Sequence, residues 1–455
     1  MGRRGAARQA VTACVLAAVA LGAGTACTSG SASPAASPGT APGTAAGGSG
    51  VALPARALLS PGCSAATATG VALGSAGTAS VQTGNPFGVA ATPDGRWGFA
   101  VSSATGSVEV LRLGDGTASA PTVTKVRSIS LPAPLGPDAT GAAVTPDGKY
   151  LLVAGGSGAL VISVARAEAG TAGAVLGSLT SPARAGSAGA AGGAIEVAVS
   201  PDSRFAFVTL EYADEAVVFN LAESLTNGFG TSGYVGAIPL GQATVGMAVS
   251  PDGRWLYATS EVAASGQQPV GLGSPGGCSG TVPGAQAGEP PGTLSVIDLR
   301  QAETDPGQSV TATVDAGYQP VRVVTAADGT QVWVTARASD DVLCFAASRL
   351  ASDPAHALVA VVRVGSEPVG LAAVRDGTLL VVADSNRFSA SGQNSALSVV
   401  SVPAALAGRP AILGDLTTGL FPRDMAVSPD GTLLVADYSA GRVQAIATAA
   451  LPAAG

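Results

Sequence analysis

The sequence predicts an all-β protein built from seven similar four-stranded units, and three observations predict it. Seven segments repeat one pattern, an apolar stretch that runs into a turn, most often Ser/Thr-Pro-Asp-Gly. The turn aspartates are 48 to 55 residues apart, with one interval of 76, and stand at Asp94, Asp147, Asp202, Asp252, Asp328, Asp376 and Asp430. Each interval has room for four short strands. Four strands in about 50 residues form one blade of a β-propeller, so the sequence predicts seven blades.

The four strands of a unit follow one another in a fixed order. The first is the apolar stretch before the turn, where Pro sets φ and Gly supplies a positive φ. The second follows the turn, as at residues 255–259, and the third alternates in polarity, as at residues 294–298. The fourth, such as residues 310–314, leads to the next unit.

The seventh unit contains only three strands and ends near Thr448. Residues 77–83, ahead of the first turn, form a fourth strand that lacks a blade of its own. We expect this N-terminal strand to complete the last blade and to close the ring without an open edge. The propeller is then predicted over residues 76–455, after an N-terminal extension at 51–75.

The repeats resemble the YVTN family of propellers, whose units run Pro-x-Gly-Val-Ala-Val-Ser-Pro-Asp-Gly and continue into an apolar strand ending near Val-Thr. The match is found at residues 86–89, 207–209, 320–322 and 368–370, and it covers nearly all of 76–448. Related seven-bladed groups include lactonases of the 6-phosphogluconolactonase type and gluconolactonase-like proteins. The resemblance implies the fold, whereas activity has to be argued from a site.

The N-terminus has the pattern of a secretory signal. Arg3, Arg4 and Arg8 precede an apolar run at residues 10–24, which is too short for a membrane span. The run ends in Gly-Thr-Ala-Cys and resembles a bacterial lipoprotein signal, although Gly24 stands where an aliphatic residue is usual. The resemblance implies a signal peptide at 1–26 and a lipid on Cys27; an ordinary secretory signal is the alternative.

The segment after Cys27 is predicted to be a tether. Residues 28–50 contain only Ser, Thr, Ala, Gly and Pro, so nothing there can build a core. The tether, with Cys27, spans residues 27–50. We therefore expect an extracytoplasmic protein that is held at the cell membrane by its lipid anchor, or is secreted.

Composition excludes several function classes. Only 12% of the 455 residues are charged and the net charge is −7, which argues against nucleic acid as a partner. His356 is the single histidine, so multi-histidine metal sites and bis-histidine haem are excluded. We expect His356 on the surface of the face opposite the candidate site, where no Ser-His-Asp triad can use it.

Aligning the units places one residue of each blade at the mouth of the axial channel. These residues are Gly88, Gly141, Glu196, Gly246, Arg322, Gly370 and Asp424. Glycines suit a crowded axis, while Glu196, Arg322 and Asp424, with the adjacent Arg423, form a charged set. This set predicts a site for a polar ligand or, through Glu196 and Asp424, one divalent cation such as Ca²⁺. A structural ring of ion pairs is the alternative.

The loops between second and third strands place more charges on the same face. They are Glu211, Asp214, Glu215, Arg337, Asp340, Asp341, Asp384, Arg387 and Asp437. Two of these loops are long, residues 262–292 and 384–395, and suit either recognition or a disordered excursion. Cys344 is predicted to be a buried free thiol, which leaves Cys63 and Cys278 as a candidate disulfide.

Two functions from different classes fit these features. The first is a monomeric, non-enzymatic binding or scaffold module whose loop face takes an extracytoplasmic protein or a cell-wall glycan. The second, implied by the lactonase resemblance, is a metal-assisted lactone hydrolase with Glu196 and Asp424 as ligands. We favour binding, because Arg322 places a positive charge where the metal would lie.

Overall fold

A computed structural model describes residues 72–73, 77–114, 121–133, 138–182, 192–267, 269–271, 290–387 and 395–454. The chain divides into two compact units, Met1–Arg56 and Ala57–Gly455, and the described residues all belong to the second. The predicted signal peptide and tether, together with Cys27, Cys63 and Cys278, lie outside the described residues. Within the described ranges, no helix is long and apolar enough to cross a membrane.

Seven antiparallel sheets of four strands each make up the described fold, which confirms the predicted seven-bladed β-propeller. In order from the innermost strand outward, blade one contains β2 (Pro86–Ala91), β3 (Trp97–Ser102), β4 (Ser107–Leu113) and β5 (Val123–Ser130), blade two contains β6 (Ala142–Val144), β7 (Tyr150–Gly155), β8 (Gly158–Ser163) and β9 (Val175–Thr180), and blade three contains β10 (Ala194–Val199), β11 (Phe205–Leu210), β12 (Glu215–Asn220) and β13 (Tyr234–Pro239). Blade four contains β14 (Gln242–Val249), β15 (Trp255–Val262), β16 (Thr293–Asp298) and β17 (Val310–Asp315), and blade five contains β18 (Pro320–Thr325), β19 (Gln331–Ala336), β20 (Asp341–Ala346) and β21 (Leu358–Arg363). Blade six contains β22 (Pro368–Val374), β23 (Leu379–Asp384), β24 (Ala396–Ser401) and β25 (Ile412–Thr417), and blade seven contains β26 (Pro422–Val427), β27 (Thr432–Asp437), β28 (Arg442–Ala447) and β1 (Thr78–Gln82).

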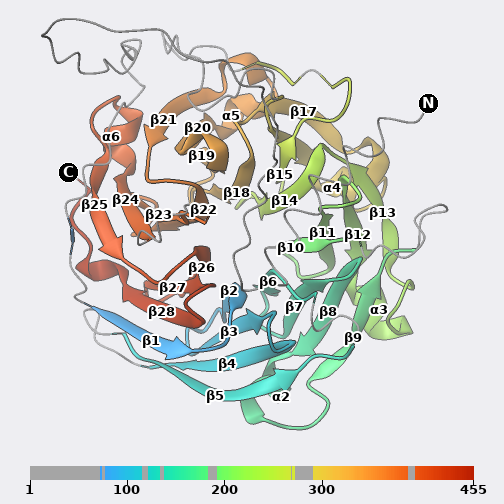
Figure 1. Cartoon of the computed structure of the whole chain (residues 1–455). Coiled ribbons are helices and arrows are strands. Elements are labelled where there is room, and N and C mark those ends of the chain that lie inside the picture. The colour runs from blue at the N-terminus through green and yellow to red at the C-terminus, as the bar shows by residue number, and fades with distance from the viewer. Residues whose placement is uncertain are drawn as a thin grey trace, which may run out of the picture. The chain divides into compact units, whose positions relative to one another are not determined.

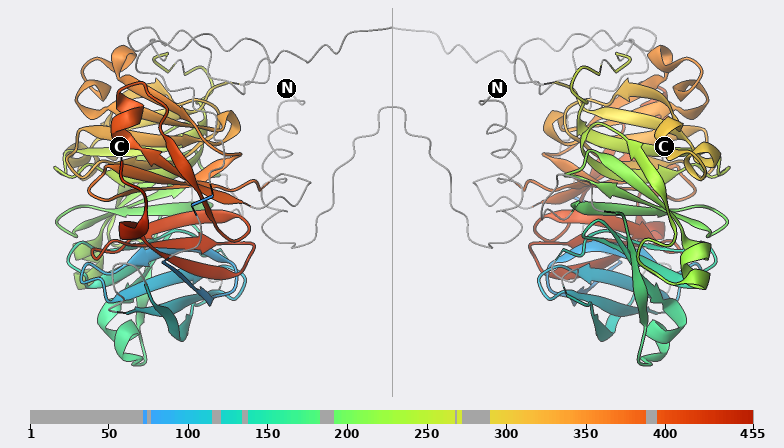
Figure 2. Two further views of the ribbon diagram at one scale, coloured as in Figure 1. Left: turned by 90° about the vertical axis from the view of Figure 1, so that its left-hand side faces the viewer. Right: turned by 90° about the vertical axis from the view of Figure 1, so that its right-hand side faces the viewer.

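The blades follow chain order around a central axis. The first strand of each blade borders the centre of the ring and the fourth strand lies at its rim (Figure 1). Two side views show the strands running between the two faces of the ring (Figure 2). This arrangement brings the starts of all seven first strands together at one end of the axis, where the candidate residues lie.

The N-terminal strand β1 belongs to the sheet of blade seven. It pairs antiparallel with β28, with Thr78 opposite Ile446 and Gln82 opposite Arg442. The backbone amide of Leu73 also donates to the carbonyl of Asp415 in blade six, at 2.8 Å. The two ends of the propeller sequence therefore lie side by side.

Hydrogen bonds within the turn explain why its sequence recurs from blade to blade. In blade one the Thr92 hydroxyl donates to the Asp94 carboxylate at 2.5 Å, and the same carboxylate accepts from the amide of Arg96. Gly95 has a φ of +72°, a conformation that favours glycine. Equivalent Ser/Thr–Asp bonds recur in blades two, three and four, so the motif is a self-capping turn.

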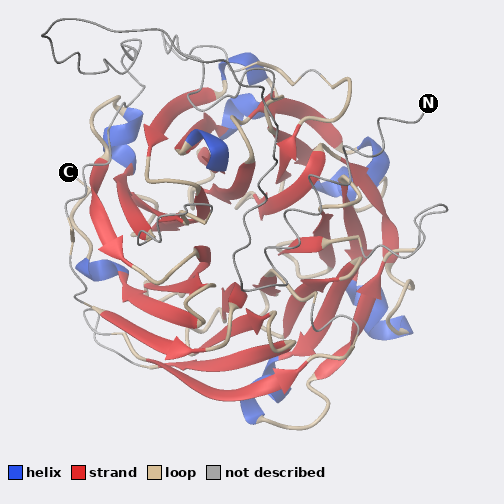
Figure 3. Ribbon diagram, in the orientation of Figure 1, coloured by secondary structure: helices blue, strands red, loops and turns tan. Residues whose placement is uncertain are grey.

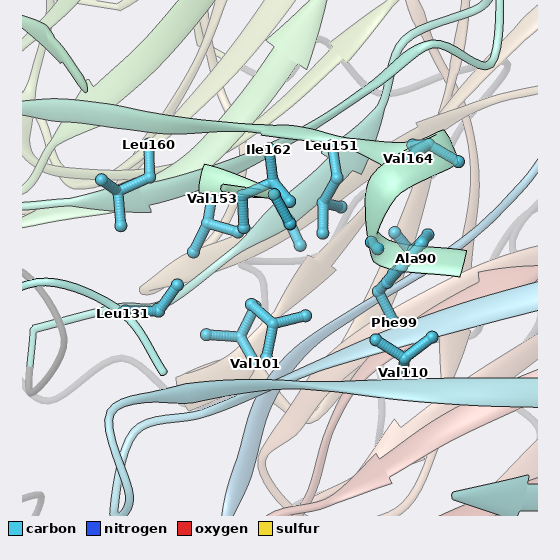
Figure 4. Close-up of a cluster of buried hydrophobic side chains, with 14 of the residues drawn as sticks. Ala90, Phe99, Val101, Val110, Leu131, Leu151, Val153, Leu160, Ile162 and Val164 are labelled. Atoms are coloured by element: carbon cyan, nitrogen blue, oxygen red, sulfur yellow. The ribbon is translucent and has the colours of Figure 1, made fainter. Parts of the chain in front are cut away.

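The core lies between the faces of neighbouring blades. Figure 4 shows the cluster between blades one and two, where Phe99, Val101 and Val110 face Leu151 and Val153. Each of these five side chains is fully buried. A buried side chain of this size contributes roughly 1.5–3 kcal/mol. Because each interface is repeated around the ring, the blades hold the first strands in fixed positions.

Short helices connect the third and fourth strands of five blades, and the sequence patterns did not predict them. They are α2 (Val164–Ala169), α3 (Leu221–Asn227), α4 (Leu299–Ala302), α5 (Ala347–Leu350) and α6 (Val402–Leu406). The 3₁₀ turns η2 (Pro306–Gln308) and η4 (Pro354–His356) lie in the same connections, whereas η3 (Arg337–Ser339) joins β19 to β20 and η5 (Thr448–Ala450) follows β28. The α-helices lie toward the outside of the ring (Figure 3). At four to seven residues they are shorter than a periodicity search resolves.

Two single-residue predictions are confirmed. Cys344 on β20 is a buried free cysteine with no exposed surface. His356 lies in η4 with its side chain 65% exposed, 2.8 Å from the Asp353 carboxylate. Neither residue contributes to the mouth of the channel.

Candidate functional site

Three charged side chains from three different blades meet across the axis. The Arg322 guanidinium of blade five lies 3.2 Å from the Glu196 carboxylate of blade three and 3.5 Å from the Asp424 carboxylate of blade seven. The side chains are 7%, 13% and 11% exposed. These blades are not neighbours, so the contacts span the centre of the ring. We refer to Glu196, Arg322 and Asp424 as the axial triad.

The local backbone holds the triad in place. The amide of Arg322 donates to the Thr335 hydroxyl at 3.0 Å, and the amide of Val89 donates to the Asp424 carboxylate at 2.9 Å. The equivalent positions in blades one, two, four and six are glycines, as the alignment indicates. A Cβ on Gly246 would lie 2.2 Å from the Val321 carbonyl oxygen, so blade four has no room there for a side chain. Glycine is thus required by the crowding that the sequence predicted.

Burial dominates the ionisation of the triad. Burial raises the pKa of Glu196 from its usual 4.5 to about 7, although Arg322 lowers it, and the Asp424 carboxylate raises it further. The same two carboxylates raise the pKa of Arg322 against the effect of burial, so the guanidinium stays charged. One cation therefore balances two acids, of which Glu196 binds a proton near neutral pH.

We expect the stability of the propeller to fall as pH rises from about 4.5 to 7. In this window the unfolded chain has released the Glu196 proton, while the folded chain retains it up to about pH 7. The folded state then binds more protons, and its free energy of unfolding decreases with rising pH. Denaturant unfolding at several pH values measures this slope. Glu196→Gln should reduce it, and an unchanged slope in that variant would contradict the assignment.

A collar of apolar side chains surrounds the axis one residue before the triad positions. Its members come from five blades and pack as one cluster: Phe87, Ile195, Val245, Val321 and Val369. Phe421, which directly precedes β26, and Tyr438, which directly follows β27, pack against the collar. Phe87 and Phe421 both meet Tyr438 edge-on, with ring centroids 6.2 and 5.5 Å away.

Arg423 occupies the collar position of blade seven, where five other blades have an apolar residue. Its guanidinium carbon lies 3.5 Å from the centre of the Phe87 ring and 5.5 Å from that of Phe421. Its Nε is buried without a hydrogen-bond partner among the described residues. Burial, with the neighbouring Arg387 and Arg322, lowers the pKa of Arg423 well below its usual value. Among the described residues, no carboxylate therefore lies close enough to pair with the Arg423 guanidinium.

The second-to-third-strand loops contribute further charged side chains, of which Arg387 and Glu211 interact electrostatically with Arg423. Arg337 donates to Glu261 at 3.0 Å and to Gln319 at 2.8 Å. Arg387 stacks on Phe421, with its guanidinium carbon 5.1 Å from the centre of the ring. Burial, together with the nearby Glu261 carboxylate, raises the pKa of Glu211 to about 7.

These residues make one polar and aromatic group, which we call the mouth cluster. It consists of Phe87, Glu211, Glu261, Arg337, Arg387, Phe421, Arg423 and Tyr438. The axial triad closes it from below.

Asp384 and Asp437 were predicted on the same face, but the structure buries both inside their blades. Asp437 accepts from the Thr418 hydroxyl at 2.6 Å and the Gly419 amide at 2.9 Å, and pairs with Arg442. Asp384 accepts from the Ser398 hydroxyl at 2.6 Å. Burial raises the pKa of each carboxyl group. Asp437 thus holds the link that enters its blade, and a backbone hydrogen bond from Gly365 joins Asp384 to the equivalent link of blade six.

The predicted cation site does not fit this arrangement. Glu196 and Asp424 both face the Arg322 guanidinium, whose charge would repel a divalent ion between them. In the described part of the chain, no group of three or more His, Cys, Asp and Glu side chains is placed to hold a metal. Most of the 262–292 insertion lies outside that part.

The aromatic half of the mouth cluster was not predicted from the sequence. Phe87 and Arg423 both stand directly before an aligned axial position, so extending the alignment by one residue reveals the collar. Glu261 lies at the end of β15, which is longer than the repeat predicts. Phe421 has a φ of +52° and belongs to no strand, so no repeat pattern could place it.

Comparison with known proteins adds information about the fold. The chain matches no family model and no curated protein. Among solved structures it is similar to hydrazine synthase from Kuenenia stuttgartiensis, with a TM-score of 0.54 and 15% sequence identity. The match covers 80% of this chain and 96% of that chain. At this identity the similarity shows the propeller fold and says nothing of activity.

Proposed function

We propose that this protein is an extracytoplasmic binding module, anchored through Cys27, that takes a ligand or partner at the mouth cluster. The observation that supports it is Arg423, a partly buried cation stacked on Phe87. No described carboxylate lies within ion-pair distance of it. The resemblance to YVTN propellers stays a prediction, as do the lipid anchor and the Cys63–Cys278 disulfide.

A partly buried cation without a carboxylate partner among the described residues has to be explained energetically. Removing a guanidinium from water costs several kcal/mol unless a partner compensates it. Stacking on an aromatic ring returns only about 0.5–2 kcal/mol. A protein that retains Arg423 in the place of an apolar collar residue therefore keeps a group that a bound partner can satisfy.

The test is a binding screen with purified protein against cell-wall glycan fragments, extracytoplasmic protein fractions and small polar ligands. Arg423→Gln is compared with Arg96→Gln, a 61%-exposed arginine at a turn on the opposite face. We expect a ligand whose binding is lost in the first variant and kept in the second. Binding that survives Arg423→Gln unchanged would contradict the proposal, and turnover of lactones would favour the hydrolase instead.

A further inference from the structure

We infer that the mouth cluster binds a carboxylate carried on an otherwise uncharged ring, with the carboxylate on Arg423 and the ring against the aromatic side chains. This inference rests on the proposed binding function and names the class of ligand. The carboxylate could belong to a free organic acid or to an acidic sugar, and the experiment below separates these sources.

The Arg423 guanidinium is held in an orientation that suits an anion. Phe87 covers one face of the Arg423 guanidinium, which fixes the plane of its N–H groups. A planar fork of N–H donors matches the two oxygens of a carboxylate. Arg387, which stacks on Phe421, adds positive charge beside this fork. A carboxylate there would replace the close counter-ion that Arg423 lacks among the described residues.

The aromatic side chains beside Arg423 offer a surface for the body of the ligand. Phe421 and Tyr438 are only partly buried, while the collar side chains beneath them are buried. Rings that meet edge-on present an apolar surface next to the cation. The Arg322 guanidinium of the axial triad is only 7% exposed and already lies within ion-pair distance of two carboxylates, so it offers no accessible charge to a second anionic group. The ligand is therefore expected to have one acidic end and an otherwise uncharged body.

We expect the ionisation of Glu211 to make the affinity for the ligand depend on pH. The charged groups that face it are Glu261, Arg423, Arg337 and Arg387. No hydrogen bond or ion pair joins the Glu211 carboxylate to another described residue. Its ionised form repels an incoming carboxylate, and its protonated form does not. Because the pKa of Glu211 is about 7, binding should tighten as pH falls from 8 to 6.

The experiment is isothermal titration of purified protein with two matched pairs of probes. Benzoate is compared with benzamide, and glucuronate with glucose, so each pair differs in charge on one body. We expect at least one acid to bind more than tenfold tighter than its neutral partner. Preference for benzoate indicates an organic acid, and preference for glucuronate an acidic sugar.

Variants connect the binding to the named residues. Arg423→Gln should weaken the preferred acid about 10- to 100-fold, and Arg423→Lys should weaken it less. Glu211→Gln should tighten binding at pH 8 and remove the pH dependence, a gain that misfolding cannot produce. Arg96→Gln is the control and should bind like the natural protein.

Two results would overturn the inference. One is equal affinity for acid and neutral probe in both pairs. The other is acid binding that Arg423→Gln and Glu211→Gln leave unchanged. Mouth binding of a neutral glycan fragment, lost in Arg423→Gln, would overturn the ligand class while leaving the proposed function intact.

Discussion

Replacing Arg322 with Met is expected to destabilise the propeller by about 3–5 kcal/mol at pH 7, because the change leaves two buried carboxylates without their cation. Arg322 is only 6% exposed, so water cannot compensate the loss. Chemical denaturation measured by circular dichroism gives the free energy of unfolding. The loss should shrink at pH 5, where the freed carboxylates take up protons more readily.

A triple variant separates the charge effect from packing. Glu196→Gln and Asp424→Asn, combined with Arg322→Met, remove all three charges at nearly constant volume and should restore most of the stability. The Arg96→Met variant removes an exposed ion pair and should change little. A triple variant as unstable as Arg322→Met alone would show that the triad contributes through shape and not through charge.

A chain that begins at Gly84, and therefore lacks β1, is expected to lose about 2–5 kcal/mol of stability. The loss has two physical sources, the five paired residues of β1 and the exposure of the β28 edge. An exposed edge also pairs with other chains, so we expect concentration-dependent association. Thermal unfolding and analytical ultracentrifugation measure the two effects.

The matched control is a chain that begins at Val71, which keeps β1 and the Leu73–Asp415 contact. A synthetic peptide of residues 72–83 added to the shorter chain should restore part of its stability. If the chains beginning at Gly84 and Val71 unfold at the same temperature, β1 does not contribute to closing the ring.

The sequence was sufficient for the architecture because the information is repeated. Seven copies of one turn fix the blade boundaries, and alignment of the copies brings Glu196, Arg322 and Asp424 to one axis. Which side chains of different blades contact one another, however, depends on distances across the ring, and no repeat encodes these distances. Arg423 and Phe87 are 336 residues apart in the chain, and only ring geometry places one on the other.

The charged residues of the second-to-third-strand loops show a second limit of prediction from sequence. Alignment indicates the face on which a loop emerges, but it does not indicate which way a side chain turns. Asp437 turns into its blade because the Thr418 hydroxyl and the Gly419 amide are available there. Neighbouring Tyr438 turns toward Phe87 and Phe421 instead. Adjacent residues at a strand end thus have opposite roles that depend on hydrogen-bond partners from the previous blade.

The axial triad has one more consequence, for transport along the axis. An open hollow of about 350 Å³ lies at the other end of the axis, lined by residues such as Met247, Val323, Leu371 and Met425. Arg322 crosses the axis between that hollow and the mouth cluster. Passage from one end to the other would require breaking two buried ion pairs. We therefore expect a ligand of the mouth cluster to leave by the opening through which it entered.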